Sequence, residues 1–316
     1  MFVVVTPSSL RGELIVPSSK SHTLRAILFA SLAKGRSEIR EILPSPDTKA
    51  MIASMQLLGV NIEGDERFLR IEGIGGIPKV AEDVIQCGNS GQVFRFVGAL
   101  AGLIPQYTVL TGDLSIRHNR PVLPLLDGLQ QLGAFAVSCK GNGHAPIAVR
   151  GPFLTDRAVI CGKDSQPVSG LLIASALAPH PIELEVKHPG EKPWIDLTLS
   201  WFQRLGIPYV NQNYCKYQMR GGAQIAGFSY TVPGDFSTAA FLIAAALITG
   251  SELTLHNLDM NDVQGDKKIL FILQEMGAFF QIDFCEKSVT VLKGGQLQGI
   301  RIDVNDCIDA LPILAV

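Results

Sequence analysis

The chain has 316 residues, of which 47% are hydrophobic and 18% charged, with a formal net charge of −2 and a mean hydropathy of +0.26. The length suits about two domains, and the composition predicts large buried surfaces. Because the sequence has no run of lysine and arginine, it argues against nucleic acid or an anionic membrane as the main partner. No apolar run reaches the length of a membrane span.

Six cysteines and six histidines are scattered singly, with no CxxC pair and no HExxH motif. This pattern is typical of reduced, mostly buried thiols in a cytoplasmic protein and predicts no metal site. The N-terminal segment Met1–Thr6 has neither a basic stretch nor a long apolar core, so no secretory signal is predicted.

The first predicted elements are a short strand, Glu13–Val16, and a helix that follows Pro17 and runs to Ala33. Lys20 lies at the start of this helix, and Ser21 and Arg25 are four residues apart, so they share a helix face. Free backbone N–H groups, a hydroxyl and two cations together predict a phosphate or carboxylate site. The alternative is a capped helix with a solvated Lys20 and Arg25.

This order of elements recurs along the chain. Each copy has a strand, a helix of small residues, a second strand, a second helix ending at glycine, and a hairpin, so the predicted unit is βαβαββ. We expect the first helices to pack closely and the second helices to face solvent on one side. The helix-ending glycines, which suit the positive φ of a C-cap, are Gly59, Gly133, Gly206 and Gly277.

The fourth copy contains an apolar run, Ala239–Ile248, which is predicted to be a helix buried on all sides. Further along, Asp266 and Lys267 are interpreted as an acid at a helix start and a solvated base. A fifth copy begins at Gly299, and the sequence ends inside its apolar helix. We therefore expect the chain to be the N-terminal portion of a longer protein.

The starts of the first helices differ in charge between copies. The second copy offers Asn89, Gly91 and Arg95, whereas the third offers acid and amide groups without a cation. A purely structural repeat scaffold, the competing hypothesis, would not need this division. The acidic and amide residues at these starts are Asp164, Ser165 and Gln166 in the third copy, Asp235 in the fourth, and Asp306 and Asp309 in the fifth.

Arg120 is one more cation, in the second copy. Pro121 follows it and suits the first position of the next helix, so Arg120 is predicted at that helix's positive end. The sequence leaves two interpretations of Arg120 open: it binds an anion, or it is an exposed residue of a loop.

Eight motifs carry a resemblance over nearly the whole chain. They are, in order, PSSKSHTLRA, GNSGQVFR, Arg120-Pro121, DSQ, KPWIDLTL, PGDFSTAAF, MNDVQGDKK and DALPILAV. Together they resemble the 5-enolpyruvylshikimate-3-phosphate synthase family. The resemblance implies the enolpyruvyl transferase fold, an α/β (α+β) fold with βαβαββ units in two pseudo-threefold domains. One complete domain is expected at 19–232, and a partial second domain at 1–18 plus 233–316.

The resemblance implies transfer of the enolpyruvyl group of phosphoenolpyruvate to the 5-hydroxyl of shikimate 3-phosphate, with release of phosphate. The family works as a monomer without metal or organic cofactor. By similarity, Asn89 lies in the substrate site, and Asp309 is the catalytic aspartate that accepts the attacking proton. The other implied contacts are Lys20, Gly91, Arg120 and Gln166 to phosphoenolpyruvate, and Ser21, Arg25 and Ser165 to shikimate 3-phosphate, with Lys20 bridging both.

The sequence departs from the family pattern in places. Asp164 stands where serine is common, so it would repel a sugar phosphate unless it is paired or turned away. Glu191 and Trp194 also differ from the residues that members of the family have at these positions. The family's Lys-Glu-x-x-Arg segment, which includes the proton donor, would follow Val316.

Two alternative functions are considered. The UDP-N-acetylglucosamine enolpyruvyl transferase shares the fold, but it would carry Lys-Asn at Lys20-Ser21 and a reactive cysteine between Leu114 and Pro121, where this sequence has none. A non-catalytic fragment that binds a sugar phosphate remains open.

Overall fold

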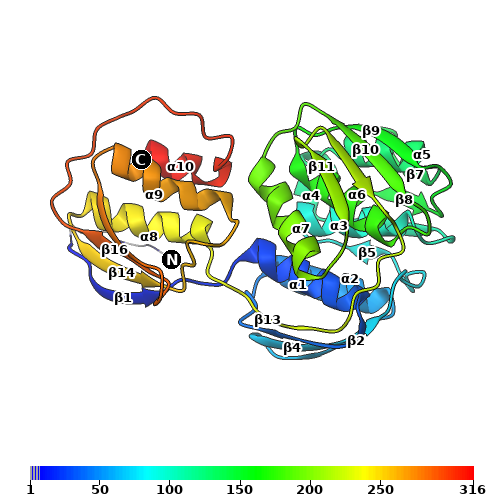
Figure 1. Cartoon of the computed structure of the whole chain (residues 1–316), viewed down its shortest axis with the longest axis horizontal. Coiled ribbons are helices and arrows are strands. Elements are labelled where there is room, and N and C mark those ends of the chain that lie inside the picture. The colour runs from blue at the N-terminus through cyan, green and yellow to red at the C-terminus, as the bar shows by residue number, and fades with distance from the viewer. Residues whose placement is uncertain (1, 3, 5, 7) are drawn as a thin grey trace. The chain divides into compact units, whose positions relative to one another are not determined.

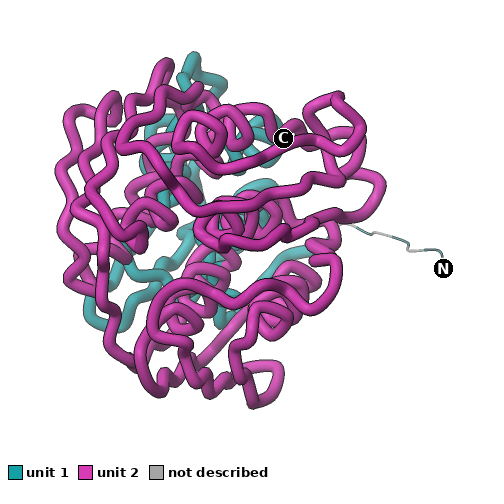
Figure 2. The backbone as a smooth tube through the Cα atoms, turned by 90° about the vertical axis from the view of Figure 1, so that its right-hand side faces the viewer, with its two compact units in different colours: residues 1–19, 233–316 teal, residues 20–232 magenta. Residues whose placement is uncertain are grey.

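A computed structural model describes residues 2, 4, 6 and 8–316 (Figure 1). The chain folds as two compact units. Unit 1 comprises Met1–Ser19 and Pro233–Val316, and unit 2 comprises Lys20–Val232 (Figure 2). The segment Met1–Thr6, for which no secretory signal is predicted, lies partly outside the described residues.

Within the described residues, the strands form four sheets of four strands that share one topology: a parallel pair followed by two antiparallel neighbours. This common pattern is the structural form of the sequence repeat. Unit 2 contains three of the sheets, in the orders β13(Ser229–Thr231)-β2(Lys34–Arg40)-β4(Phe68–Ile74)-β3(Asn61–Gly64), β5(Ile85–Gln86)-β6(Thr108–Thr111)-β8(Ile147–Arg150)-β7(Phe135–Ser138) and β9(Arg157–Cys161)-β10(Ile182–Lys187)-β12(Lys216–Met219)-β11(Tyr209–Gln212).

The first strands of the first and fourth copies are exchanged between sheets. The sheet of unit 1 has the order β1(Arg11–Ile15)-β14(Glu252–His256)-β16(Ser288–Leu292)-β15(Phe279–Asp283), so β1 pairs with a strand of the fourth copy. In return, β13 pairs parallel to β2 in unit 2. The second and third copies keep their own first strands.

The helices of unit 2 divide into two kinds, as the sequence predicts. Three are buried almost completely: α1(Lys20–Leu32), α3(Gly91–Ala101) and α6(Ser165–Leu177). The second helices bury only one face: α2(Pro46–Leu57), α5(Leu123–Gln131) and α7(Lys192–Arg204), while α4(Leu114–His118) is a short additional turn. The starts of α1, α3 and α6 are therefore set by a rigid core.

Helices α3 and α6 approach closely at Gly170. A Cβ atom added there would lie 2.9 Å from the backbone oxygen of Arg95 and 3.2 Å from Ala99 Cβ. Only glycine allows this spacing, which fixes the two helix starts relative to each other.

In unit 1, helix α8(Phe236–Ile248) corrects one prediction. The helix is not buried on all sides, because Phe241 and Ile248 are 54% and 62% exposed. The unit has a single sheet, and α8 covers it with one face together with α9(Lys268–Glu275), so the described residues leave the other face of α8 open.

The predicted fifth copy is only partly formed. Its helix is present as η2(Ile308–Ala310) and α10(Leu311–Ala315), but its expected strand after Gly299 is absent from the described residues. A strand needs a hydrogen-bonded neighbour, and none of the described strands pairs with this segment.

We predict that Gly170→Ala lowers the free energy of unfolding of unit 2 by about 1–2 kcal/mol, because the new methyl group meets a backbone atom that cannot move alone. This value is the net effect, after the gain in helix propensity of about 1 kcal/mol is subtracted from the cost of the steric clash. Urea unfolding can be followed by tryptophan fluorescence, since both tryptophans, Trp194 and Trp201, belong to unit 2.

Gly98→Ala in α3 is the matched control, because its Cβ would meet only the movable end of Leu125 at 3.2 Å and of Ile147 at 3.5 Å. Gly98→Ala should therefore destabilise less than Gly170→Ala. The reverse order would contradict the close-approach argument.

Candidate functional site

The first predicted site residues lie at the start of α1. Lys20 is its first residue and is exposed, whereas Arg25 is 2% exposed. Arg25 Nη1 donates to the backbone oxygen of Ser21 at 3.2 Å, so Ser21 and Arg25 do share a helix face.

Arg25 is a buried cation whose partners are all neutral. Its Nε donates to Thr198 Oγ1 at 3.0 Å and its Nη2 to the backbone oxygen of Trp194 at 3.0 Å, and its guanidinium lies 5.1 Å from the centre of the Phe96 ring. Among the described residues, no carboxylate forms an ion pair with it. Burial lowers the pKa of Arg25 to about 9, so the group is still charged at neutral pH. A buried charge is expensive without a counter-charge.

A second buried cation, Arg95, connects three helix starts. Its Nη1 donates to Gln166 Oε1 at 3.0 Å, its Nη2 donates to the backbone oxygen of Pro121 at 3.0 Å, and Nη2 lies 2.9 Å from Asp164 Oδ2. Burial lowers the pKa of Arg95, and the Asp164 carboxylate opposes that shift. Arg95 therefore ties the turn before α5 and the start of α6 to α3.

Gly91 brings the backbone of α3 close to two cations. A Cβ atom added at Gly91 would lie 2.7 Å from Arg95 Nη1 and 4.0 Å from Arg120 Nη1. Arg120 is thus beside the start of α3, although it is itself exposed. Asn89 is an exposed turn residue before Ser90, the N-cap of α3.

The predicted position of Pro121 is wrong. Helix α5 begins at Leu123 with Val122 as its N-cap, and Pro124 fills the early proline position instead. The Pro121 carbonyl accepts from Arg95 and so is used outside the helix. Arg120 therefore lies in the loop between α4 and α5.

At the start of α6, the two acids that depart from the family pattern are both engaged. Asp164 is the N-cap: its Oδ1 accepts from Gln166 N at 2.9 Å, while its other oxygen pairs with Arg95. The expected repulsion by Asp164 is thus offset by pairing. Glu191 Oε2 accepts from Ser165 N at 3.1 Å and from Ser165 Oγ at 2.8 Å.

Eight of the nine predicted site residues belong to unit 2, and Asp309 belongs to unit 1, where it is exposed in η2. Near Asp309, the interpretation of Asp266 as an acid at a helix start is confirmed, since Asp266 lies in η1, but its side chain is buried, with 3% exposed. Its Oδ2 accepts from Ser237 Oγ, and its Oδ1 is buried with no hydrogen-bond partner among the described residues. Lys267 is not a solvated base, because its Nζ donates to the backbone oxygens of Met260 and Asp262.

The physical cause of Asp266 burial is the packing of η1(Gly265–Lys267) against α8 and η2. The pKa of Asp266 is raised to about 7, mainly by burial; the Ser237 hydrogen bond lowers the pKa, and the nearby Asp309 and Asp235 carboxylates raise it.

Sequence reasoning missed Thr198, which accepts from Arg25. A signal was present, because Trp194, Thr198 and Trp201 follow helical spacing on one face of α7. It also did not anticipate that Gln92 Nε2 and Arg95 Nε are buried donors without a partner among the described residues.

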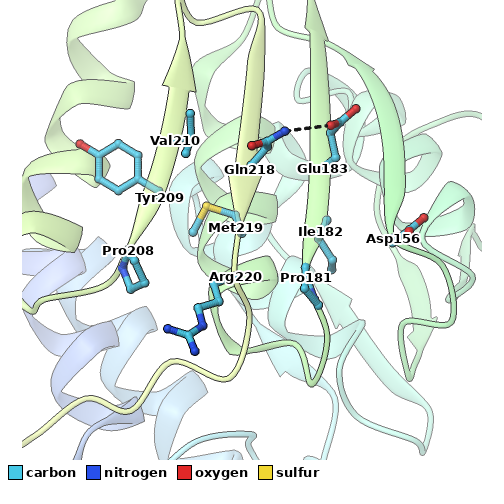
Figure 3. A pocket seen from close by; sticks show the side chains of 10 residues that line it. All are labelled: Asp156, Pro181, Ile182, Glu183, Pro208, Tyr209, Val210, Gln218, Met219 and Arg220. Atoms are coloured by element: carbon cyan, nitrogen blue, oxygen red, sulfur yellow. Dashed lines mark hydrogen bonds between the residues drawn. The ribbon is translucent and has the colours of Figure 1, made fainter.

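A surface pocket of about 440 Å³ lies elsewhere in unit 2, on the sheet that contains β10 and β12 (Figure 3). Its lining includes Ile182, Tyr209, Met219 and Arg220, and it contains none of the predicted site residues. The pocket is therefore separate from the anion site predicted at the helix starts.

Comparisons with known proteins agree with one another. The family model described as EPSP synthase (3-phosphoshikimate 1-carboxyvinyltransferase) matches residues 4–316. Proteins named 3-phosphoshikimate 1-carboxyvinyltransferase from Acetivibrio thermocellus and Chlamydia felis are 43% and 42% identical to the chain; the matches cover 100% and 99% of it, and 74% and 69% of the relatives. A solved EPSP synthase from Acinetobacter baumannii matches with a TM-score of 0.79 and 26% identity, over 96% of this chain and 70% of that one.

We predict that the stability of unit 1 depends on pH through Asp266. Its pKa of about 7 in the folded state lies above the ordinary value of 3.8, so between these values the folded state binds more protons than the unfolded state. Stability should therefore fall as pH rises from 5 to 7.5, by about 2 kcal/mol more in the parent chain than in Asp266→Asn. Urea unfolding followed by circular dichroism at both pH values measures this difference.

Asp283→Asn, which changes an exposed carboxyl in the hairpin of the same unit, is the control and should keep the parent's pH dependence. If Asp266→Asn shows the same pH dependence as the parent chain, Asp266 is not a carboxyl with a raised pKa.

Proposed function

The chain belongs to the EPSP synthase family, and from this premise we propose that the helix starts of unit 2 bind the two anionic substrates of that enzyme, shikimate 3-phosphate and phosphoenolpyruvate. The enzyme transfers the enolpyruvyl group of phosphoenolpyruvate to the 5-hydroxyl of shikimate 3-phosphate and releases phosphate. This reaction belongs to the shikimate pathway of aromatic amino acid biosynthesis.

One observation carries the assignment of the binding site. Arg25 is 2% exposed, and its protein partners are two neutral oxygens of α7, the Ser21 carbonyl and an aromatic ring. An arginine held this way lacks the negative charge that normally accompanies burial. A phosphate group would supply that charge and form charge-assisted hydrogen bonds.

The roles of the other residues follow from their chemistry. Ser21 and Ser165 offer hydroxyl donors for shikimate 3-phosphate next to helix N-termini, where backbone N–H groups favour anions. Gly91 lacks the Cβ that would meet Arg95 Nη1 at 2.7 Å and Gln166 Oε1 at 3.2 Å, so these two polar groups approach the start of α3 closely, and Gln166 is held by Arg95. We assign Gly91, Arg120 and Gln166 to phosphoenolpyruvate, Lys20 to both substrates, and Asn89 to the rim.

The proposed reaction begins when the 5-oxygen of shikimate 3-phosphate bonds to C2 of phosphoenolpyruvate while its proton leaves to a base. We assign that base to Asp309. A proton adds to the methylene carbon, which gives a tetrahedral intermediate. Loss of a methyl proton and of phosphate then restores the double bond. Lys20 and Arg120 would stabilise the negative charge that shifts to the departing phosphate.

We also propose a cytoplasmic location and a monomeric state. The six cysteines are all free thiols, which suits a reducing compartment; the prediction that most of them are buried is wrong, because four are exposed. Among the described residues, no helix is long and apolar enough to cross a membrane.

We predict that Arg25→Gln weakens binding of shikimate 3-phosphate by about 100-fold, because charge-assisted hydrogen bonds to a buried phosphate are lost. Since no carboxylate of the described residues pairs with Arg25, the same change should not lower the free energy of unfolding of unit 2. Isothermal titration calorimetry measures the first effect, and urea unfolding followed by tryptophan fluorescence measures the second.

Arg157→Gln is the matched control, because Arg157 is an exposed arginine that pairs with Glu185 on a sheet of the same unit. It should bind shikimate 3-phosphate like the parent chain. Equal affinity in Arg25→Gln and the parent would rule out the proposed site. An assay of phosphate release from both substrates separates catalysis from binding alone.

A further inference from the structure

Glu191 places a carboxylate on the start of α6 in the position that an anionic ligand would take. Its Oε2 accepts both the backbone N–H of Ser165, at 3.1 Å, and the Ser165 hydroxyl, at 2.8 Å. Glu191 is not part of α6, because it is the N-cap of α7. A side chain from another element thus occupies the two donors that a phosphate oxygen would use at this helix start.

The backbone around Glu191 is arranged to bring the carboxylate there. Glu191 has φ 47° and His188 has φ 55°, in the left-handed region that residues other than glycine rarely adopt. Between them, Gly190 donates its N–H to the backbone oxygen of Gly162 at 3.0 Å, and a Cβ atom on Gly190 would lie 2.9 Å from the backbone oxygen of Lys163. The loop before α7 is therefore pressed against the loop before α6.

The buried cation near this contact already has a carboxylate partner. Arg95 is the buried cation nearby; it pairs with Asp164 at 2.9 Å and is also influenced by Glu191. The buried cation at the start of α6 is therefore already paired with Asp164, while Glu191 is held by Ser165. Lys192, which follows Glu191, is exposed, and its Nζ lies 5.4 Å from the centre of the Tyr214 ring.

We propose that Glu191 is an internal competitor of the phosphate group of shikimate 3-phosphate and sets the affinity of the site for that group. The proposal rests on the proposed function, since it concerns the same Ser165. When the sugar phosphate binds, the Ser165 N–H and O–H exchange the carboxylate for a phosphate oxygen, and Glu191 turns away. Glu191 thus weakens binding of the phosphorylated ligand and leaves the affinity for its unphosphorylated form unchanged.

The test is calorimetric titration of the full chain and of Glu191→Gln and Glu191→Ser with shikimate 3-phosphate and, separately, with shikimate. Removal of the carboxylate's charge should tighten binding of shikimate 3-phosphate by at least about tenfold, because two negative groups no longer compete for the same donors. Affinity for shikimate should stay within about twofold. Glu185→Gln, which neutralises a β10 glutamate paired with Arg157, is the control and should leave both affinities at the parent values.

Each other outcome has a distinct meaning. If the parent chain binds shikimate 3-phosphate and both Glu191 variants bind it equally or more weakly, Glu191 is not a competitor and the inference fails while the proposed function stands. If neither the parent nor any variant binds shikimate 3-phosphate while unit 2 still unfolds cooperatively, the proposed function and this inference both fail.

Discussion

The buried charge of Arg25 is the constraint on which the site depends. The packing of α1 against α7 removes its guanidinium from water, yet its hydrogen bonds go to a threonine hydroxyl and two carbonyl oxygens. In the part of the chain that the structure describes, no carboxylate pairs with this buried positive charge of unit 2. A buried charge without a counter-charge lowers the stability of a folded protein, and under the proposed function an anionic substrate would offset that cost.

Arg95 is the structural counterpart of Arg25. It is also buried, but Asp164 gives it a counter-charge, and its remaining contacts hold Gln166 and the carbonyl that follows Arg120 in place. One guanidinium thus holds the helix starts together, and we propose that the other binds a ligand. The close contact of α3 and α6 at Gly170 gives both a rigid base.

Local pattern predicted much of this. The βαβαββ repeat, the buried first helices and the shared face of Ser21 and Arg25 depend on periodicity and small residues, which are properties of short stretches. Burial of Asp266 and the partners of Glu191 depend on which distant elements meet, and a single sequence does not carry that information. The exposed face of α8 has the same origin, since a run of apolar residues does not specify how many elements cover it.

The most direct test of the central claim is to observe the Arg25 guanidinium itself. In a chain labelled with ¹⁵N-arginine, the Nε–H resonance that is missing from Arg25→Gln belongs to Arg25. We predict that this resonance shifts on addition of shikimate 3-phosphate and saturates at the same ligand concentration as the heat of binding. An unchanged Arg25 resonance at saturating ligand would show that the buried charge has another purpose, and it would contradict the assignment of Arg25 to the phosphate group.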